Sequence, residues 1–168
     1  MLPPMITIEP ITAANVQLFK DVRLRALADT PSAFGSTYAR EAAFPDSEWL
    51  ARALRWNGER GIGLLAMDGP AGCGIAGSFL REDDPAKAQL ISMWTAPSHR
   101  QQGVGRQLVN EIFHWARSRN VRELLLMVTS VNQSAMAFYD RLGFTRTGHT
   151  EPYPNDPAIH EYEMSRAV

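Results

Sequence analysis

The stretch Arg100-Gln101-Gln102-Gly103-Val104-Gly105 stands between a β-like run at residues 89–95 and a helical pattern that begins at Val104. Glycines lack a Cβ and let backbone N–H groups come close to a ligand, and the first turn of a helix has N–H groups without partners. Such a turn binds phosphate, and the side chains of Arg100 and Arg106 would strengthen the binding. The sequence therefore predicts a strand, a turn and a helix that together hold an anion.

Three other interpretations of this turn exist. A P-loop requires Lys followed by Ser or Thr after its last glycine, and Arg106-Gln107 stands there instead. A dinucleotide-binding fingerprint requires a small residue where Leu108 stands, and it normally opens the first β-α unit of a chain. The third interpretation is a tight connection that binds nothing, and the residues downstream argue against it.

Apolar periodicity and turn residues extend this unit in both directions. They predict β-like runs at residues 5–9, 62–67, 73–80, 89–95 and 123–128, two more in 144–164 around a turn at 152–157, and helices that begin near residues 12, 46, 104 and 132. The second helix is expected to be capped at Asp46 and to end near Gly58, and Pro97, which lacks a backbone donor, is expected to end or disturb the sheet. Early hairpins and a later β-α-β crossing indicate an α/β (α+β) sheet, mostly antiparallel with one parallel pair. A length of 168 residues suits a single domain, residues 1–168.

Composition and charge exclude several function classes. A formal net charge of −1 offers no basic field for nucleic acid. Residues 1–5 carry no basic segment before an apolar run, and no stretch of about eighteen apolar residues occurs, so we expect a cytoplasmic protein without a membrane partner. Cys73 is the only cysteine and is expected to be buried, and the scattered histidines, among them His99 and His160, predict no metal site.

Further segments stand at defined spacing from the glycine turn: Leu90 to Pro97, Asn132 to Ala135, Phe138-Tyr139 and Leu142 to Phe144. Together with the turn they resemble the GNAT superfamily of acyl-CoA-dependent N-acetyltransferases, over roughly residues 90–144. The resemblance implies a GNAT-like three-layer fold whose mixed, mostly antiparallel central sheet is splayed between two parallel strands. It also implies acetyl-CoA in the opening, as cosubstrate.

The resemblance implies a set of cofactor-binding residues. The backbone of 93–95 would bind the pantetheine arm, the turn 101–106 would bind the pyrophosphate, and Asn132 would lie near the thioester besides capping a helix. The full set is Met93, Trp94, Thr95, Arg100, Gln101, Gln102, Gly103, Val104, Gly105, Arg106, Asn132 and Phe138.

Acetyl transfer to an amine requires proton movements at two places. An alkyl ammonium with a pKa of about 10.4 is free base to about one part in a thousand at neutral pH, which costs roughly 4 to 5 kcal/mol. Tyr139 matches the family position of the general acid, and a phenol is protonated at neutral pH. In several relatives a carboxylate or histidine on the preceding strand is the base, but residues 90–96 contain neither.

Several points therefore stay open in the sequence. The base could be water or a loop group, namely Glu41, Glu82, Glu151 or His149, while Ser92 and Thr95 are the only hydroxyls on the preceding strand. Phe34, Tyr38, Phe44 and Trp49 could line an acceptor pocket or pack a helical region. The leading prediction is direct transfer to a primary amine of a small molecule or peptide. The alternatives are an acetyl-Cys73 intermediate and a non-catalytic acyl-CoA binding or sensing module, and the exposed edge of a splayed sheet makes a homodimer plausible.

Overall fold

A computed structural model gives the structure of residues 5–168; the first four residues, part of the stretch considered above for an export signal, lie outside the described residues. Seven strands form one sheet in the order β1-β2-β3-β4-β5-β7-β6, and each neighbouring pair is antiparallel except β4 and β5. The strands are β1 (Ile6–Pro10), β2 (Gly61–Asp68), β3 (Ala71–Leu80), β4 (Lys87–Thr95), β5 (Glu123–Thr129), β6 (Thr145–Tyr153) and β7 (Asp156–Ala167).

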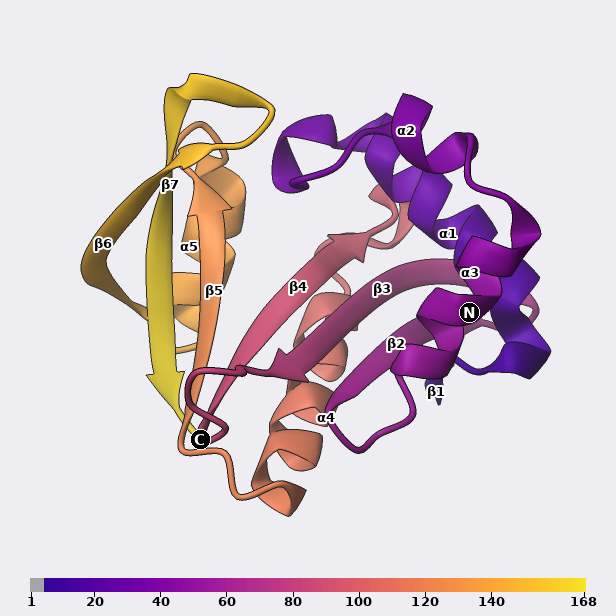
Figure 1. The fold of residues 1–168 in the computed structure, drawn as a ribbon, viewed down its shortest axis with the longest axis horizontal. Helices are drawn as coiled ribbons and strands as arrows, with labels where there is room; N and C mark the ends of the chain where they lie inside the picture. The colour runs from indigo at the N-terminus through magenta and orange to yellow at the C-terminus, as the bar shows by residue number, and fades with distance from the viewer. Residues whose placement is uncertain (1–4) are drawn as a thin grey trace.

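Helices cover both faces of this sheet, which makes three layers (Figure 1). They are α1 (Val16–Asp29), α2 (Tyr38–Ala42), α3 (Asp46–Arg55), α4 (Val104–Ser118) and α5 (Gln133–Arg141), with 3-10 turns at Ala13–Asn15, Pro31–Ala33 and Pro97–His99. The first three helices lie over β1 to β4 on one face, and α4 packs on the other face of these strands. None of the helices in residues 5–168 is long and apolar enough to cross a membrane.

The sheet opens between its two parallel strands. β4 and β5 pair only at Lys87–Gln89 with Glu123–Leu125, and beyond these residues they separate (Figure 1). The predicted mixed, mostly antiparallel sheet with a splayed parallel pair is therefore confirmed. From Leu90 onward the edge of β4 that faces β5 has no strand partner within residues 5–168.

A β-bulge distorts β4 where it borders the opening. The register between β3 and β4 shifts between Ile75 and Gly77, and Ser92 on β4 has a φ of 59°, in the left-handed region that side chains other than glycine seldom adopt. β4 then ends at Thr95, two residues before the proline that was expected to disturb the sheet. The bulge re-aims the backbone of β4 at the point where the sheet splits.

Four details differ from the sequence-based expectation. α2 was missed because a helix of five residues is too short for a periodic pattern. α3 ends at Arg55 instead of near Gly58, and Pro45 instead of Asp46 is its N-cap. The last turn is shorter than 152–157, because β6 runs to Tyr153 and β7 begins at Asp156.

Candidate functional site

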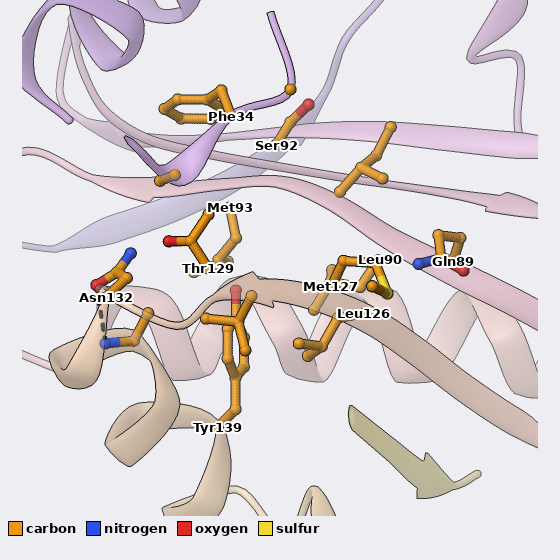
Figure 2. A pocket seen from close by; sticks show the side chains of 15 residues that line it. Phe34, Gln89, Leu90, Ser92, Met93, Leu126, Met127, Thr129, Asn132 and Tyr139 are labelled. Carbon is orange, nitrogen blue, oxygen red and sulfur yellow. Dashed lines mark hydrogen bonds between the residues drawn. The ribbon is translucent and has the colours of Figure 1, made fainter. Parts of the chain in front are cut away.

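The opening of the sheet contains a cleft of about 230 Å³ of free volume (Figure 2). Its walls are the separated parts of β4 and β5, and the loop before α2 and the start of α5 close its ends. The lining residues are Ala33, Phe34, Gly35, Gln89, Leu90, Ile91, Ser92, Met93, Leu126, Met127, Val128, Thr129, Asn132, Ala135 and Tyr139. Predicted site residues from three separate segments, Met93, Asn132 and Tyr139, thus meet in one cavity.

α4 begins at the predicted glycine turn. Gly103 is its N-cap with a φ of 82°, and Gln101 before it has a φ of 63°. Within residues 5–168 no side chain caps the first turn, so its backbone N–H groups have no side-chain partner. A Cβ on Gly103 would meet nothing within 4 Å, so the glycine serves the left-handed backbone of this turn.

Gly105 has a different structural reason. A Cβ at this position would lie 2.9 Å from Cζ of Phe138 and 3.2 Å from Cε of Met93. The missing side chain therefore lets α5 approach α4, and it also brings the Phe138 ring against the start of α4. The close approach that the sequence assigned to a ligand is, for Gly105, made by the protein itself.

Arg100 and Trp94 direct their side chains away from the cleft. The Arg100 guanidinium donates to the carbonyl of Thr95 at 3.0 Å and pairs with Asp29 on α1, and the Trp94 indole donates to the same Asp29 carboxylate at 3.0 Å. The Trp94 hydrogen bond, with the pairing to Arg100, holds the pKa of the Asp29 carboxyl below its usual range. These two side chains fix the end of β4 to α1, so only their backbone remains available to the cleft.

The Tyr139 hydroxyl points into the cleft while its ring is packed in the core. The residue is 8% exposed, and its ring lies 5.7 Å from that of Phe144 and 5.2 Å from that of Phe138. Figure 2 shows the hydroxyl directed toward β5 and the cavity. Burial raises the pKa of Tyr139 well above its ordinary value, so the phenol stays protonated as a hydrogen-bond donor.

Asn132 caps α5 and also lines the cleft. Its Oδ1 accepts from the backbone N–H of Ala135 at 3.3 Å, so the predicted helix cap is confirmed. With the oxygen committed to the cap, the amide nitrogen is the group turned toward the opening in Figure 2.

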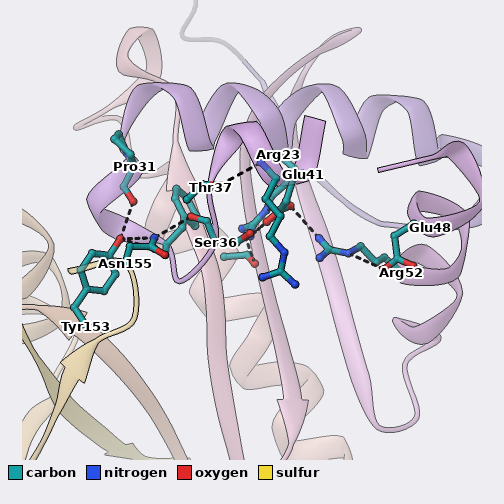
Figure 3. A network of polar contacts seen from close by, with 12 residues as sticks. Arg23, Pro31, Ser36, Thr37, Glu41, Glu48, Arg52, Tyr153 and Asn155 are labelled. Carbon is teal, nitrogen blue, oxygen red and sulfur yellow. Dashed lines mark hydrogen bonds and ion pairs between the residues drawn. The ribbon is translucent and has the colours of Figure 1, made fainter. Parts of the chain in front are cut away.

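A strap made by residues 31–36 bridges the two halves of the split sheet (Figure 3). The Tyr153 hydroxyl donates to the carbonyls of Pro31 and Phe34, at 3.0 and 2.5 Å, and the Asn155 amide donates to the carbonyl of Phe34 at 3.0 Å. The Thr129 hydroxyl donates to the carbonyl of Ser32 at 3.1 Å. The β6–β7 turn therefore holds the strap in place across the end of the cleft.

A buried ionic network supports the other wall. Glu41 is fully buried and accepts two hydrogen bonds from Arg23 and one from Arg52, each 2.9 Å long (Figure 3). Burial opposes the charged form of Glu41, but the two guanidinium groups outweigh it and hold its pKa below the usual range. Arg23 also donates to the Ser92 hydroxyl at 3.2 Å and lies over the Phe34 ring. Glu41 thus positions the cleft wall and is unsuited to take up a proton.

The other groups considered for the base lie outside the cleft. An outer hollow of about 470 Å³ adjoins it and shares Gln89 and Met127 with its lining. Glu82, Glu151 and His149 border this hollow, and the His149 ring is bound to Glu151 at 2.9 Å, which raises the pKa of His149.

Most of the other residues that the sequence suggested for an acceptor pocket or a metal site lie outside the cleft. Trp49 packs edge to face against both Phe44 and Phe19, while Tyr38 is 48% exposed. Of the four aromatic residues considered for an acceptor pocket, only Phe34 lines the cleft. His99 bonds to Asp68 at 2.8 Å and His160 is exposed. Within residues 5–168 no group of three or more His, Cys, Asp or Glu side chains is arranged to hold a metal.

Cys73 is buried on β3, with 1% of its surface exposed, and does not line the cleft. Burial, with a contribution from Asp68, raises the pKa of its thiol. Since the thiolate is the nucleophile, this environment disfavours covalent chemistry at Cys73.

Comparison with known proteins gives consistent matches. A family model described as "Acetyltransferase (GNAT) family" matches residues 24–144. N-alpha-acetyltransferase RimI of Mycobacterium tuberculosis is 26% identical over 162 residues, which cover 96% of this chain and 92% of RimI. Human N-acetyltransferase 8 is 33% identical over 89 residues, which cover 53% of this chain but only 34% of the human protein. An acetyltransferase of Salmonella typhimurium, solved with its cofactor acetyl-CoA, shares the fold with a TM-score of 0.78 at 17% identity, over 97% of this chain and 94% of that chain.

Proposed function

The chain belongs to the acetyltransferase (GNAT) family, and we propose that it transfers the acetyl group of acetyl-CoA directly to a primary amine in a ternary complex. One observation carries the proposal: the unpaired edge of β4 borders a cleft that contains the Tyr139 hydroxyl and opens beside the uncapped N-terminus of α4. An extended thioester with an anionic far end matches these three features. The Salmonella neighbour solved with acetyl-CoA supports the choice of cosubstrate.

In this proposal the backbone of β4 and the first turn of α4 hold acetyl-CoA. The N–H groups of residues 101–106, aided by the Arg106 side chain, bind the pyrophosphate. The backbone of Met93 to Thr95 hydrogen-bonds the pantetheine arm as a neighbouring strand would. The Asn132 amide nitrogen reaches the arm near the thioester, and the Phe138 ring packs beside it.

The chemistry then needs few protein groups. The amine, once deprotonated, attacks the thioester carbonyl, the C–S bond breaks, and the thiolate departs with the electron pair. Tyr139 donates a hydrogen bond to the sulfur as charge develops there. Cys73 takes no part, because it is buried away from the cleft with a raised thiol pKa.

In this proposal the acceptor is an amine of a small molecule or of the end of a peptide. It reaches the thioester inside the cleft, one end of which the strap closes. The name of the RimI relative refers to an α-amine, which favours peptide N-termini among the candidates.

The decisive experiment measures CoA release with three probes: a peptide with a free N-terminal alanine, an N-terminally blocked peptide with one lysine, and spermidine. Release that depends on one of these amines supports the proposal, and mass spectrometry of the product locates the acetyl group. Binding of acetyl-CoA without release on any probe would favour a non-catalytic acyl-CoA module. Full activity of Cys73→Ala is expected, and loss of activity would indicate an acetyl-cysteine intermediate. The cytoplasmic location and the homodimer are tested by fractionation and by light scattering.

A further inference from the structure

α5 covers one face of β5 and β7 (Figure 1), and strand pairing places several acidic residues of β6 and β7 on the opposite face. On β5, Leu126 and Val128 belong to the core, so the alternating residues Met127 and Thr129 face the other side, where both line the cleft. In the antiparallel pairing, Met127 stands opposite Glu163 on β7 and Thr129 stands opposite Glu161. Directly opposite residues share a face with Cβ atoms about 5 Å apart, so Glu161 stands on β7 next to Thr129 of the cleft wall, one strand behind the lining itself.

The carboxylates of this face differ in what they bind. Glu163 accepts a hydrogen bond from the Thr147 hydroxyl at 2.8 Å, and Glu151 binds His149 at 2.9 Å. Asp83, on the rim of the outer hollow, is held by Arg81 through two hydrogen bonds. Glu161 is half-buried and has no hydrogen-bonding or ionic partner for its side chain among residues 5–168. Glu82, on the rim of the outer hollow, also has no such partner among residues 5–168, but it is exposed. Glu161 is therefore the half-buried carboxylate of this region whose proton affinity no cation lowers.

We propose that Glu161 takes up, through water, the proton that the acceptor ammonium must lose, an inference that rests on the proposed acetyl transfer. The ammonium N–H bond breaks and its electron pair stays on nitrogen, while the proton passes along water to the carboxylate. The free amine then attacks the thioester, and the CoA thiol leaves with a proton. Glu161 finally returns its proton to solvent, so the sum is ammonium plus acetyl-CoA giving amide, CoA and one proton.

The surroundings of Glu161 favour this role. Burial, and then the charge of Glu151 directly opposite on β6, raise the pKa of Glu161. The charged groups facing it are Glu151 with its partner His149 and, along β7, Glu163; the strap residues 31–36 carry no charge. A base is most effective when its pKa approaches the working pH, so a raised carboxyl pKa helps. Like charges on directly paired residues destabilise a sheet, which fits a function for this pair.

The test compares Glu161→Gln with wild type at saturating acetyl-CoA, using the amine probe that the wild type acetylates. Well below the pKa of that amine we expect kcat/KM for the amine to fall, at least about 100-fold at pH 7 for a lysine amine, as for loss of a general base. The variant should regain rate by about tenfold per pH unit and approach wild type near the amine pKa, about 10.4 for lysine and about 8 for a peptide N-terminus, because only free amine then reacts. CoA affinity by calorimetry and the melting temperature should stay unchanged, which excludes misfolding.

Two control variants separate proton transfer from a general charge effect. Glu163→Gln removes a carboxylate from the same strand and face and should keep the wild-type pH profile. Glu151→Gln removes a charge that raises the pKa of Glu161, so the acid limb of the wild-type profile should move to lower pH. Three outcomes overturn the role of Glu161 but leave the proposed acetyl transfer intact. They are a wild-type pH profile in Glu161→Gln, a loss of kcat/KM in Glu161→Gln that is equal at every pH, and a Glu163→Gln profile that matches that of Glu161→Gln. A wild-type protein that acetylates none of the probes overturns the proposed function, and the role of Glu161 with it.

Discussion

Removal of the Tyr139 hydroxyl should slow the reaction without disturbing the fold or the binding of CoA. The hydroxyl points into the cleft and has no hydrogen-bond partner within residues 5–168, while the ring packs on Phe138 and Phe144. Tyr139→Phe keeps these ring contacts. Its melting temperature and its affinity for CoA should therefore equal those of wild type.

The size of the loss follows from the two proton affinities. A thiol resembling cysteine has a pKa of about 8.5, and burial raises the pKa of Tyr139 above that of an ordinary phenol. Complete transfer of the phenolic proton to the thiolate is therefore uphill, and the hydroxyl acts mainly as a hydrogen-bond donor. A hydrogen bond to a charged group contributes about 1.5 to 3 kcal/mol, so kcat should fall about 10- to 150-fold.

The assay is thiol release at saturating acetyl-CoA for both proteins, from about pH 6 to about pH 10. The wild type should show no loss of rate on the alkaline side that corresponds to ionisation of Tyr139, because the raised pKa lies beyond this range. Unchanged turnover in Tyr139→Phe would refute the assignment. The reasoning about hydrogen-bond donation would be refuted by a different result: a wild-type rate that falls near the ordinary thiol or phenol pKa, with no such fall in Tyr139→Phe.

Three further predictions concern the frame of the site. Gly103→Ala places a side chain at a φ of 82°, which costs about 1 to 2 kcal/mol, and should weaken CoA binding measured by calorimetry. Gly58→Ala is the matched control, at a φ of 89° with nothing within 4 Å and outside the cleft lining, and should leave CoA binding unchanged. Gly105→Ala gains about 1 kcal/mol of helix propensity, but the new methyl group is overpacked against Phe138. We expect a net loss of about 1 kcal/mol in the free energy of unfolding, measured in urea, and recovery of that loss when Phe138→Leu is added. A single variant that is more stable than wild type would contradict the packing. Glu41→Gln should lose about 3 kcal/mol at neutral pH because two guanidinium groups lose their buried partner. Folding lowers the pKa of Glu41, so its contribution to the free energy of unfolding is fully present above the ordinary carboxyl pKa of 4.5. That contribution is lost as the pH falls through the lowered pKa, and the stabilities of wild type and Glu41→Gln should become equal in acid.

The sequence predicts well those parts of the site that are local along the chain. The glycine turn before α4, the helix α4 itself and the Asn132 cap each depend on residues within one or two turns. The sequence does not predict where side chains point when partners are distant. Arg100 and Trp94 are turned toward Asp29, more than 60 positions earlier, and only the folded chain reveals this pairing.

Glu161 shows the same limit from the opposite direction. Its position in the sequence, on a polar strand near the C-terminus, carries no motif and no spacing to the glycine turn. Its relation to the cleft depends on the register of β7 with β5, and a shift by one residue would turn it to the α5 face. The alternation of residues along β5 gives part of this information, because the core residues Leu126 and Val128 identify which face of the strand is buried. The register of β7 against β5, however, is known only from the folded structure.

The splay that creates the cleft leaves part of the sheet without its usual hydrogen bonds. Backbone groups of β4 beyond Gln89 face β5 without pairing, and an unpaired backbone group near the core costs stability. The protein offsets this by holding the two halves together elsewhere: the strap joins the β6–β7 turn, and Arg23 ties Ser92 at the bulge to Glu41. These contacts lie at the ends and the outer wall of the cleft and leave the β4 edge itself free. A split sheet held open in this way is preorganised for an extended ligand, because binding then requires little rearrangement of the backbone.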